Sequence, residues 1–321
     1  MTPTIGLVIP CYNEEEVLRE TTSRLLELLG KMRADNLVSP QSSIFYVDDG
    51  SRDKTWALIQ ELSAAHSEVC GIRLSRNRGH QNALLCGLLT APGDALISVD
   101  ADLQDDLDVI PKMVQALIDG DDIVYGVRRK RTTDTFFKRF TAEGYYKLLA
   151  LMKVQIVFNH ADYRLMSRRA IEALGEYREV NLFLRGMVPL LGFRNSIVEY
   201  DRAERFAGES KYPLGKMLSL AWQGITSFST SPLRLITTIG FIISAVSIGL
   251  ATWAMFMRLF TSEALPGWAS TVIPMYFLGG VQLLSLGVIG EYVAKIYTET
   301  KDRPRFHVDR LEGNAFRQQK P

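Results

Sequence analysis

Two aspartates separated by one residue, Asp100 and Asp102, carry the clearest chemical potential in this chain. They follow a short, mostly apolar run, residues 95–99, which predicts a buried strand. In an open α/β sheet, ligands bind beyond the carboxyl ends of the strands. Two carboxylates at that edge can hold a hard divalent cation, which keeps waters and bridges substrate phosphates. An Asp-rich surface turn gives the same pattern, so the other motifs have to decide.

Short apolar runs alternate with helical patterns between residues 5 and 127, and they predict the sheet that positions these carboxylates. The predicted strands are 5–10, 44–47, 72–74, 95–99 and 122–126. Alternation of this kind predicts an α/β fold, with a mostly parallel sheet and helices on both faces. Residues 11–15 are expected to form a loop that leads into the first helix, with the acidic residues Glu14 and Glu15 in its first turn, where the helix dipole favours them.

A second acidic motif, Asp48-Asp49-Gly50-Ser51, ends the second predicted strand. A carboxylate at a strand end can accept a hydrogen bond from a nucleotide base or ribose. The same stretch can simply cap the next helix through Ser51 or Asp53, and both roles are compatible. Gly79 and His80 follow the third strand, but one glycine is a weak signal and a histidine there fits an ordinary loop equally well.

The composition argues against nucleic-acid binding, and with the N-terminal sequence it indicates the compartment. The 321 residues carry a net charge of only +1, so no bulk attraction favours nucleic acid. The three cysteines are an odd number without metal-ligand spacing, which fits a reducing compartment. The N-terminus begins directly with a strand pattern and lacks the features of a signal peptide, so the N-terminal part is expected to stay in the cytosol.

The C-terminal third predicts two membrane spans. Residues 235–257 and 264–290 contain no charged residue, and each run exceeds the ~20 apolar residues that cross a bilayer. Aromatic residues lie near the ends of the runs, and basic residues flank them on the outer sides, which places the large N-terminal part in the cytoplasm. The chain is therefore expected to be a multi-pass membrane protein. A hydrophobic core helix is the alternative for each run.

Two further segments combine basic and apolar residues. Residues 136–152 form an amphipathic pattern that fits a helix in the membrane interface or a helix packed on the sheet. Residues 214–228 predict a second interface helix, and the basic loop 202–212 is suited to closing over phosphates. The expected division is a catalytic domain at 1–212, a juxtamembrane helix at 213–231, a transmembrane hairpin at 232–292 and a cytoplasmic tail at 293–321.

Taken together, the motifs resemble the family-2 glycosyltransferases that charge polyprenyl phosphates, a group that includes dolichol-phosphate mannose synthases and bactoprenol (undecaprenyl-phosphate) glucosyltransferases. The two C-terminal runs and the motif at 224–229 look most like the bactoprenol enzymes. One departure is Asp106, where relatives often have proline, and it alters the loop but not the ligands. The matching segments, in chain order, are 8–14, 47–51, 100–105, 126–128, 162–167, 205–212, 224–229, 232–234 and 290–292.

The resemblance implies a GT-A fold, a Rossmann-like arrangement, and assigns roles to individual residues. Asp100 and Asp102 would hold Mg²⁺ or Mn²⁺ and, with Asp162 and Arg164 near the reacting sugar, form the catalytic group. The nucleotide sugar would contact Pro10, Tyr12, Glu14, Asp48, Asp49, Ala101, Gln104 and Arg128. The phosphates of donor and acceptor would be bound by Arg131, Arg205 and Lys211, together with Arg128.

The reaction that the resemblance implies is transfer of a hexose, with UDP-glucose as the expected donor, to undecaprenyl phosphate with inversion at the anomeric carbon. The location that it implies is the cytoplasmic face of the bacterial cytoplasmic (inner) membrane. Mannose, N-acetylglucosamine and aminoarabinose remain open as alternative sugars. A processive synthase would carry more spans and a Gln-x-x-Arg-Trp motif, which this chain lacks. A catalytically silent membrane scaffold is the alternative from another class. The spans and interface helices also lead us to expect a homo-oligomer.

Overall fold

The computed structural model describes residues 2–129, 160–180, 182–201, 230–260 and 267–317. The chain forms two compact units. The first contains Met1–Tyr146, Gln155–Tyr212 and Asp302–Pro321, and the second contains Lys147–Val154 and Pro213–Lys301. The last twenty residues therefore belong to the same unit as the N-terminal sheet.

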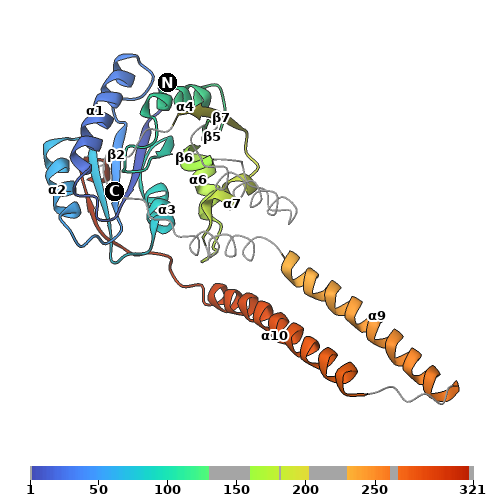
Figure 1. Ribbon diagram of the computed structural model, residues 1–321. Coiled ribbons are helices and arrows are strands. Elements are labelled where there is room, and N and C mark those ends of the chain that lie inside the picture. The colour runs from blue at the N-terminus through green and yellow to red at the C-terminus, as the bar shows by residue number, and fades with distance from the viewer. Residues whose placement is uncertain (1, 130–159, 181, 202–229, 261–266, 318–321) are drawn as a thin grey trace. The chain divides into compact units, whose positions relative to one another are not determined.

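The first unit is built on one eight-stranded sheet with the order β7-β5-β6-β4-β1-β2-β3-β8 (Figure 1). Its strands are β1 (Ile5–Cys11), β2 (Ser43–Asp48), β3 (Val69–Leu74), β4 (Ala95–Ser98), β5 (Ile123–Arg128), β6 (His160–Ser167), β7 (Asn195–Tyr200) and β8 (Val308–Glu312). Strand β1 pairs in parallel with β2 and β4, β2 with β3, and β5 with β7. Among the described strands, β6 and β8 run antiparallel to their neighbours. The predicted α/β class with a mostly parallel sheet is confirmed.

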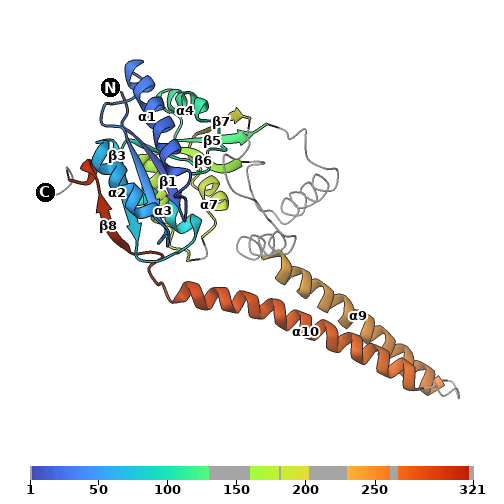
Figure 2. The ribbon, with the colours of Figure 1, turned by 60° about the vertical axis from the view of Figure 1, so that its left-hand side comes forward.

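Helices cover both faces of this sheet (Figure 2). They are α1 (Leu18–Ala34), α2 (Thr55–Ala65), α3 (His80–Thr90), α4 (Ile110–Ile118), α6 (Arg168–Gly175), α7 (Leu184–Leu190) and α11 (Asn314–Arg317). A 3₁₀ turn at Leu107–Val109 leads into α4, whose first turn contains Pro111, a position where the missing N–H costs no helical hydrogen bond.

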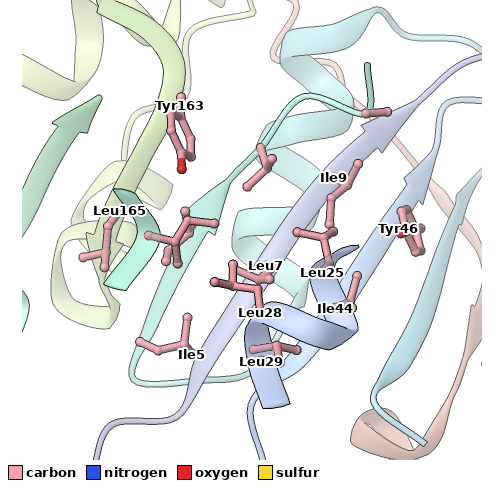
Figure 3. Packing of buried hydrophobic residues seen from close by; sticks show 14 of the residues in the cluster. Ile5, Leu7, Ile9, Leu25, Leu28, Leu29, Ile44, Tyr46, Tyr163 and Leu165 are labelled. Carbon is pink, nitrogen blue, oxygen red and sulfur yellow. The ribbon is translucent and has the colours of Figure 1, made fainter. Parts of the chain in front are cut away.

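One face of the sheet packs under α1, α2 and α4. Alternate residues of β1, namely Ile5, Leu7 and Ile9, are fully buried there because successive side chains of a strand point to opposite faces. Leucines of α1 lie over them, and Tyr163 and Leu165 of β6 extend the same cluster towards the other end of the sheet (Figure 3). This continuous apolar layer fixes β4 and β6 beside β1.

The opposite face packs against α3. A Cβ atom placed on Gly87 of α3 would lie 2.4 Å from Val8 of β1 and 2.7 Å from Val47 of β2. Val8 and Val47 each lie next in sequence to a residue that faces the other layer, because successive side chains of a strand point to opposite faces of the sheet. The close approach of α3 to β1 and β2 places the first residue of α3, His80, at the carboxyl edge of the sheet.

Two sequence expectations change. Helix α1 begins at Leu18, so Glu14 and Glu15 precede it and do not lie in its first turn. The backbone N–H of Glu14 instead donates to Thr55, the first residue of α2, and that of Glu15 donates to Asp53 in the loop before α2. Strands β6, β7 and β8 were not predicted, and β8 lies within the expected tail 293–321, where it pairs with β3.

The second unit contains the helices α9 (Ser231–Phe260) and α10 (Gly267–Thr300). Within them, Pro232–Leu250 and Phe277–Thr300 have mean hydropathies of 1.9 and 1.5, and neither window is buried inside the molecule. Large apolar side chains such as Phe241, Ile248 and Leu283 are more than half exposed. Both helices are therefore long and apolar enough to cross a membrane. The predicted helices at 136–152 and 214–228 lie outside the described residues.

Candidate functional site

The loop after β4 presents Asp100 and Asp102 at the carboxyl edge of the sheet. Three contacts fix its backbone: Val99 N–H donates to the Val8 carbonyl, the Thr21 hydroxyl donates to the Ala101 carbonyl at 3.0 Å, and Gln104 N–H donates to Asp102 at 3.2 Å. The carboxylates thus stand on a braced turn. Ala101 and Gln104 are buried beneath it.

A buried ionic group on β6 lies next to this loop. Asp162 accepts from Arg164 at 2.5 Å and from Arg185 of α7 at 3.1 Å. Both Asp162 and Arg164 are buried, and Arg164 also donates to the Leu184 carbonyl at 3.4 Å. Pairing of Ser98 with Arg164 across β4 and β6 fixes this group beside the β4 edge.

Charge neutralisation keeps the Asp162 carboxyl ionised. Burial by itself raises the pKa of this group, but the positive charges of Arg185 and Arg164 outweigh it and hold the pKa of Asp162 well below its usual range. Burying such a pair is costly unless its hydrogen bonds are satisfied, and here two guanidinium groups share the one carboxylate. Asp162 is therefore a fixed negative charge.

His80 connects the two acidic groups. Its Nε2 lies 3.8 Å from Asp100 Oδ1 and 3.8 Å from Asp162 Oδ2. The side chain is about half exposed, at 46%, so it borders the open part of the site. The sequence left the role of His80 undecided, because a histidine after a glycine fits many loops, and only the packing of α3 against β1 brings it here.

The Asp100 carboxyl ionises less readily than an ordinary aspartate. Burial, together with the negative charges of Asp105, Asp162 and Asp102, raises its pKa to about 6. Its side chain nevertheless keeps 36% of its surface exposed, so a ligand can reach it. A carboxylate in this position gains from any cation that neutralises it.

The carboxylates of the site fit a divalent cation whose remaining ligands come from substrate and water. Within the part of the chain that the structure describes, no group of three or more His, Cys, Asp or Glu side chains is arranged to hold a metal ion. Mg²⁺ is usually held by one or two carboxylates, with waters and substrate phosphates filling the remaining positions. Asp100 and Asp102 match that requirement, because they supply two accessible carboxylates and leave the other positions open.

The loop after β2 forms a second side of the site. Asp49 accepts the backbone N–H groups of Arg78 at 2.6 Å and Gly79 at 2.8 Å. Its burial raises the pKa of this carboxyl more than the two N–H groups lower it. Asp48, in contrast, is fully buried, where it accepts from Ser51 N–H at 3.0 Å. Of the two predicted nucleotide ligands, Asp48 therefore braces the loop, whereas Asp49 ties it to the segment that precedes His80.

The loop after β1 completes this side. Asn13 has a positive φ of 55° and exchanges hydrogen bonds with the residues at 51 and 52. Glu14 N–H donates to Thr55 Oγ1 at 2.9 Å. Pro10 is buried in β1, whereas Tyr12 is exposed at 40%. The exposed ring at a strand end offers a flat surface to a ligand.

Arg128 belongs to a network that the sequence did not reveal. Its Nε donates to the Tyr200 hydroxyl at 3.1 Å, and its Nη2 lies 3.5 Å from Asp105. Tyr200 donates to Asp105 at 2.5 Å. Because Tyr200 comes from β7, no spacing in the sequence links it to these residues. The remaining predicted phosphate ligands, Arg131, Arg205 and Lys211, lie outside the described residues.

The comparisons with known proteins agree with this architecture. The family model "Glycosyl transferase family 2" matches residues 7–175, which is more than half of the chain. The chain belongs to glycosyl transferase family 2, and it is a glycosyltransferase with a GT-A fold. The matched region begins within β1 and contains β2 to β6 and the Asp100–Asp102 loop.

Relatives resemble this chain over almost its full length. The uncharacterized glycosyltransferase YkoT of Bacillus subtilis is 48% identical, covering 96% of this chain and 91% of its own. The bactoprenol glucosyl transferase of Shigella phage SfX is 39% identical, covering 94% of this chain and 97% of its own. Among solved structures, the Pyrobaculum calidifontis mannosyltransferase PcManGT in complex with GDP-Man and Mn²⁺ has a TM-score of 0.47 at 17% identity, covering 95% of this chain and 89% of its own.

Proposed function

We propose that this chain transfers glucose from UDP-glucose to undecaprenyl phosphate at the cytoplasmic face of a membrane. The convergence of Asp100, Asp102, His80 and Asp162 at the strand ends of a family-2 fold carries the proposal. A relative that is 39% identical over 94% of the chain bears the name bactoprenol glucosyl transferase. Helices α9 and α10 support a membrane location, because their apolar side chains are exposed along windows long enough to span it.

The acceptor group needs positioning more than deprotonation. A phosphate monoester has its second pKa near ~6, so the attacking oxygen is anionic at neutral pH. Asp162 is a poor proton acceptor because Arg164 and Arg185 hold its pKa low. We therefore assign Asp162 an orienting role, in which its carboxylate fixes the guanidinium groups of Arg164 and Arg185 at the edge of the site. His80 lies between Asp100 and Asp162, with its Nε2 3.8 Å from a carboxylate oxygen of each.

The leaving group is a nucleoside diphosphate. Asp100 and Asp102 would hold a divalent cation, which when bound supplies Lewis-acid stabilisation of the charge on that diphosphate. Mg²⁺ and Mn²⁺ both suit two carboxylates with substrate oxygens. Asp49 and Tyr12 flank the loops where the base and ribose would lie. A single displacement inverts the anomeric carbon, so an α-linked donor gives a β-linked lipid product.

A membrane assay tests this proposal. Membranes containing the chain would be incubated with undecaprenyl phosphate, Mg²⁺ and labelled nucleotide sugars, and lipid-extractable label would be counted. We expect label from UDP-glucose and from none of the GDP-mannose, UDP-N-acetylglucosamine or aminoarabinose donors. Label from another donor would overturn the sugar assignment but keep the mechanism. Absence of label from every donor, with folded protein, would contradict the proposed acceptor chemistry.

A further inference from the structure

A guanidinium group with no role in the sequence-based assignments lies beside the proposed reaction site. Arg185 of α7 pairs with Asp162 through two contacts, from Nε to Oδ1 at 3.3 Å and from Nη2 to Oδ2 at 3.1 Å. The Asp162 side chain is only 8% exposed, whereas 43% of the Arg185 side chain is exposed. Arg185 is therefore fixed by a buried carboxylate and is still accessible to a ligand.

The backbone next to Arg185 is held from two sides. Leu184 N–H donates to Gln81 Oε1 at 3.0 Å, and the Leu184 carbonyl accepts from Arg164 Nη1 at 3.4 Å. Gln81 belongs to α3, which lies beside α7 (Figure 2). Arg164 is buried on β6, so Arg185 is attached to the sheet through its backbone as well as its side chain. Such preorganisation lowers the cost of ordering a side chain when a ligand binds.

The group around Asp162 carries more positive than negative charge. Arg164 and Arg185 supply two positive charges, and Asp162 neutralises one of them. A divalent cation on Asp100 and Asp102 would neutralise those two carboxylates, and the excess on the Asp162 side would remain. The Arg164 side chain is 2% exposed, which is too little for contact with a ligand. The excess charge is therefore available to an anion at Arg185.

Arg185 lies close to the carboxylates assigned to the metal, with His80 between them. His80 Nε2 is 3.8 Å from Asp100 Oδ1 and 3.8 Å from Asp162 Oδ2, the atom that Arg185 Nη2 contacts. In a single displacement the diphosphate leaves from one side of the anomeric carbon, and the acceptor oxygen approaches from the other side to about 3–3.5 Å. The two phosphate groups therefore need two neighbouring but different sets of ligands.

An arginine suits the phosphate monoester of the acceptor. Its planar group has five N–H donors, so one guanidinium can bridge a carboxylate and a phosphate. Arg128 is the described arginine that the resemblance assigns to phosphates, but its side chain is 21% exposed and contacts Tyr200 and Asp105. The more exposed Arg185 is better placed to meet the acceptor beside Asp162.

We propose that Arg185 binds the phosphate group of the acceptor lipid and directs its attacking oxygen at the anomeric carbon, while Asp162 and Gln81 hold the arginine in place. That oxygen forms the new bond to the anomeric carbon as the bond to the nucleoside diphosphate breaks, and the diphosphate leaves with the electron pair. The attacking oxygen is already anionic, so Arg185 transfers no proton. The assignment rests on the proposed function, because it takes a lipid phosphate as the acceptor.

Binding measurements without nucleotide sugar test the assignment separately from the reaction. The full-length chain in non-ionic detergent would be titrated calorimetrically with farnesyl phosphate, a short polyprenyl phosphate, and with farnesol, its uncharged counterpart. A separate titration with UDP and Mg²⁺ would report the donor side. Arg185→Gln removes the charge, and Arg185→Lys keeps the charge without the planar group. The matched control is Arg194→Gln, because Arg194 pairs with Asp121 at 2.8 Å at the other edge of the sheet, before β7.

We expect Arg185→Gln to bind farnesyl phosphate about tenfold more weakly or worse, because charge-assisted hydrogen bonds to the phosphate are lost. Its affinities for farnesol and UDP should be unchanged, and Arg185→Lys should fall between the wild type and Arg185→Gln. Arg194→Gln should bind all three ligands as the wild type does. In the transfer assay, Arg185→Gln should raise the KM for undecaprenyl phosphate and leave the KM for UDP-glucose unchanged.

Two results would overturn the assignment. Unchanged binding of farnesyl phosphate by Arg185→Gln would do so even when the wild type transfers glucose, and an equal loss of affinity for UDP would assign Arg185 to the donor. Binding that depends on Arg185 in a chain that transfers no sugar would support the phosphate site and contradict the proposed reaction. If Arg185→Gln fails to fold, Arg185→Lys must bind farnesyl phosphate at least about threefold more weakly than the wild type, and equal affinity would overturn the assignment.

Discussion

The loop after β4 and the strand β6 bring carboxylates to the same site in two different electrostatic settings. Asp100 and Asp162 both lie 3.8 Å from His80 Nε2. Asp162 is paired with two guanidinium groups, which hold its pKa low. For Asp100, burial and the negative charges of Asp105, Asp162 and Asp102 outweigh the effect of His80 and raise its pKa to about 6. The position in the fold, and not the residue type, thus decides which aspartate is a permanent charge and which is free to take a cation.

The largest effect should come from the loop after β4. We expect Asp102→Asn to lower turnover at least ~10³-fold, equivalent to about 4 kcal/mol, because an amide cannot neutralise a divalent cation as a carboxylate does. Rates would be measured by lipid-linked label across a Mg²⁺ titration. The matched control is Asp106→Asn, in the same loop, which should retain activity. Full activity of Asp102→Asn would remove the functional difference between the two regions and favour the scaffold alternative.

On β6 the expected effect is on folding. Arg164→Met keeps the apolar bulk of the side chain but leaves Asp162 with only Arg185, and we expect a loss of about 3 kcal/mol in the free energy of unfolding. Denaturant unfolding followed by circular dichroism would measure it. Adding Asp162→Asn to Arg164→Met should cost less than Asp162→Asn costs in the wild type, because the two residues form one ion pair and their effects are coupled. A neutral result for Arg164→Met would show that the ion pair contributes nothing to stability.

The Arg128 network gives a smaller effect. Tyr200→Phe removes the donor to Asp105, whose other carboxylate oxygen is buried without a hydrogen-bond partner in the described chain. We expect a loss of about 1–2 kcal/mol in stability, the cost of leaving a buried acceptor less satisfied. Thermal unfolding would measure it, with Tyr177→Phe as a control outside this network. A change no larger than that of the control would exclude a structural role for the hydroxyl.

The smallest effect is a dependence of stability on pH. The folded pKa of Asp100, about 6, lies above its ordinary value of 3.8, so the folded state binds the proton more tightly and stability falls as pH rises between about 4 and 6. Because 36% of the side chain is exposed, we expect only about 1 kcal/mol. Asp162 acts in the opposite sense, since its lowered pKa adds stability that is lost as pH falls below about 4. Asp100→Asn should abolish the first change and keep the second, as measured by denaturation at several pH values.

Local sequence determined the parts of the protein that depend on neighbours along the chain. The alternation of apolar runs predicted β1 to β5 because a buried strand needs a continuous apolar stretch. The position of Asp100 and Asp102 followed from the same rule, since a polar pair after a strand must lie at the sheet edge. The two charge-free runs predicted α9 and α10 by length alone.

Only the tertiary structure decided which distant residues share the site. His80, Arg185 and Tyr200 come from α3, α7 and β7, and no spacing in the chain signals that they meet Asp100, Asp162 and Asp105. The charge states of the aspartates were likewise hidden, because a pKa depends on burial and on charges that packing brings near. The same holds for β8, whose exposed, charged sequence has no core pattern, yet it pairs with β3 in the sheet. Contacts between residues that are far apart in the sequence produce no periodic pattern along the chain. For that reason only the folded structure shows which of these residues meet.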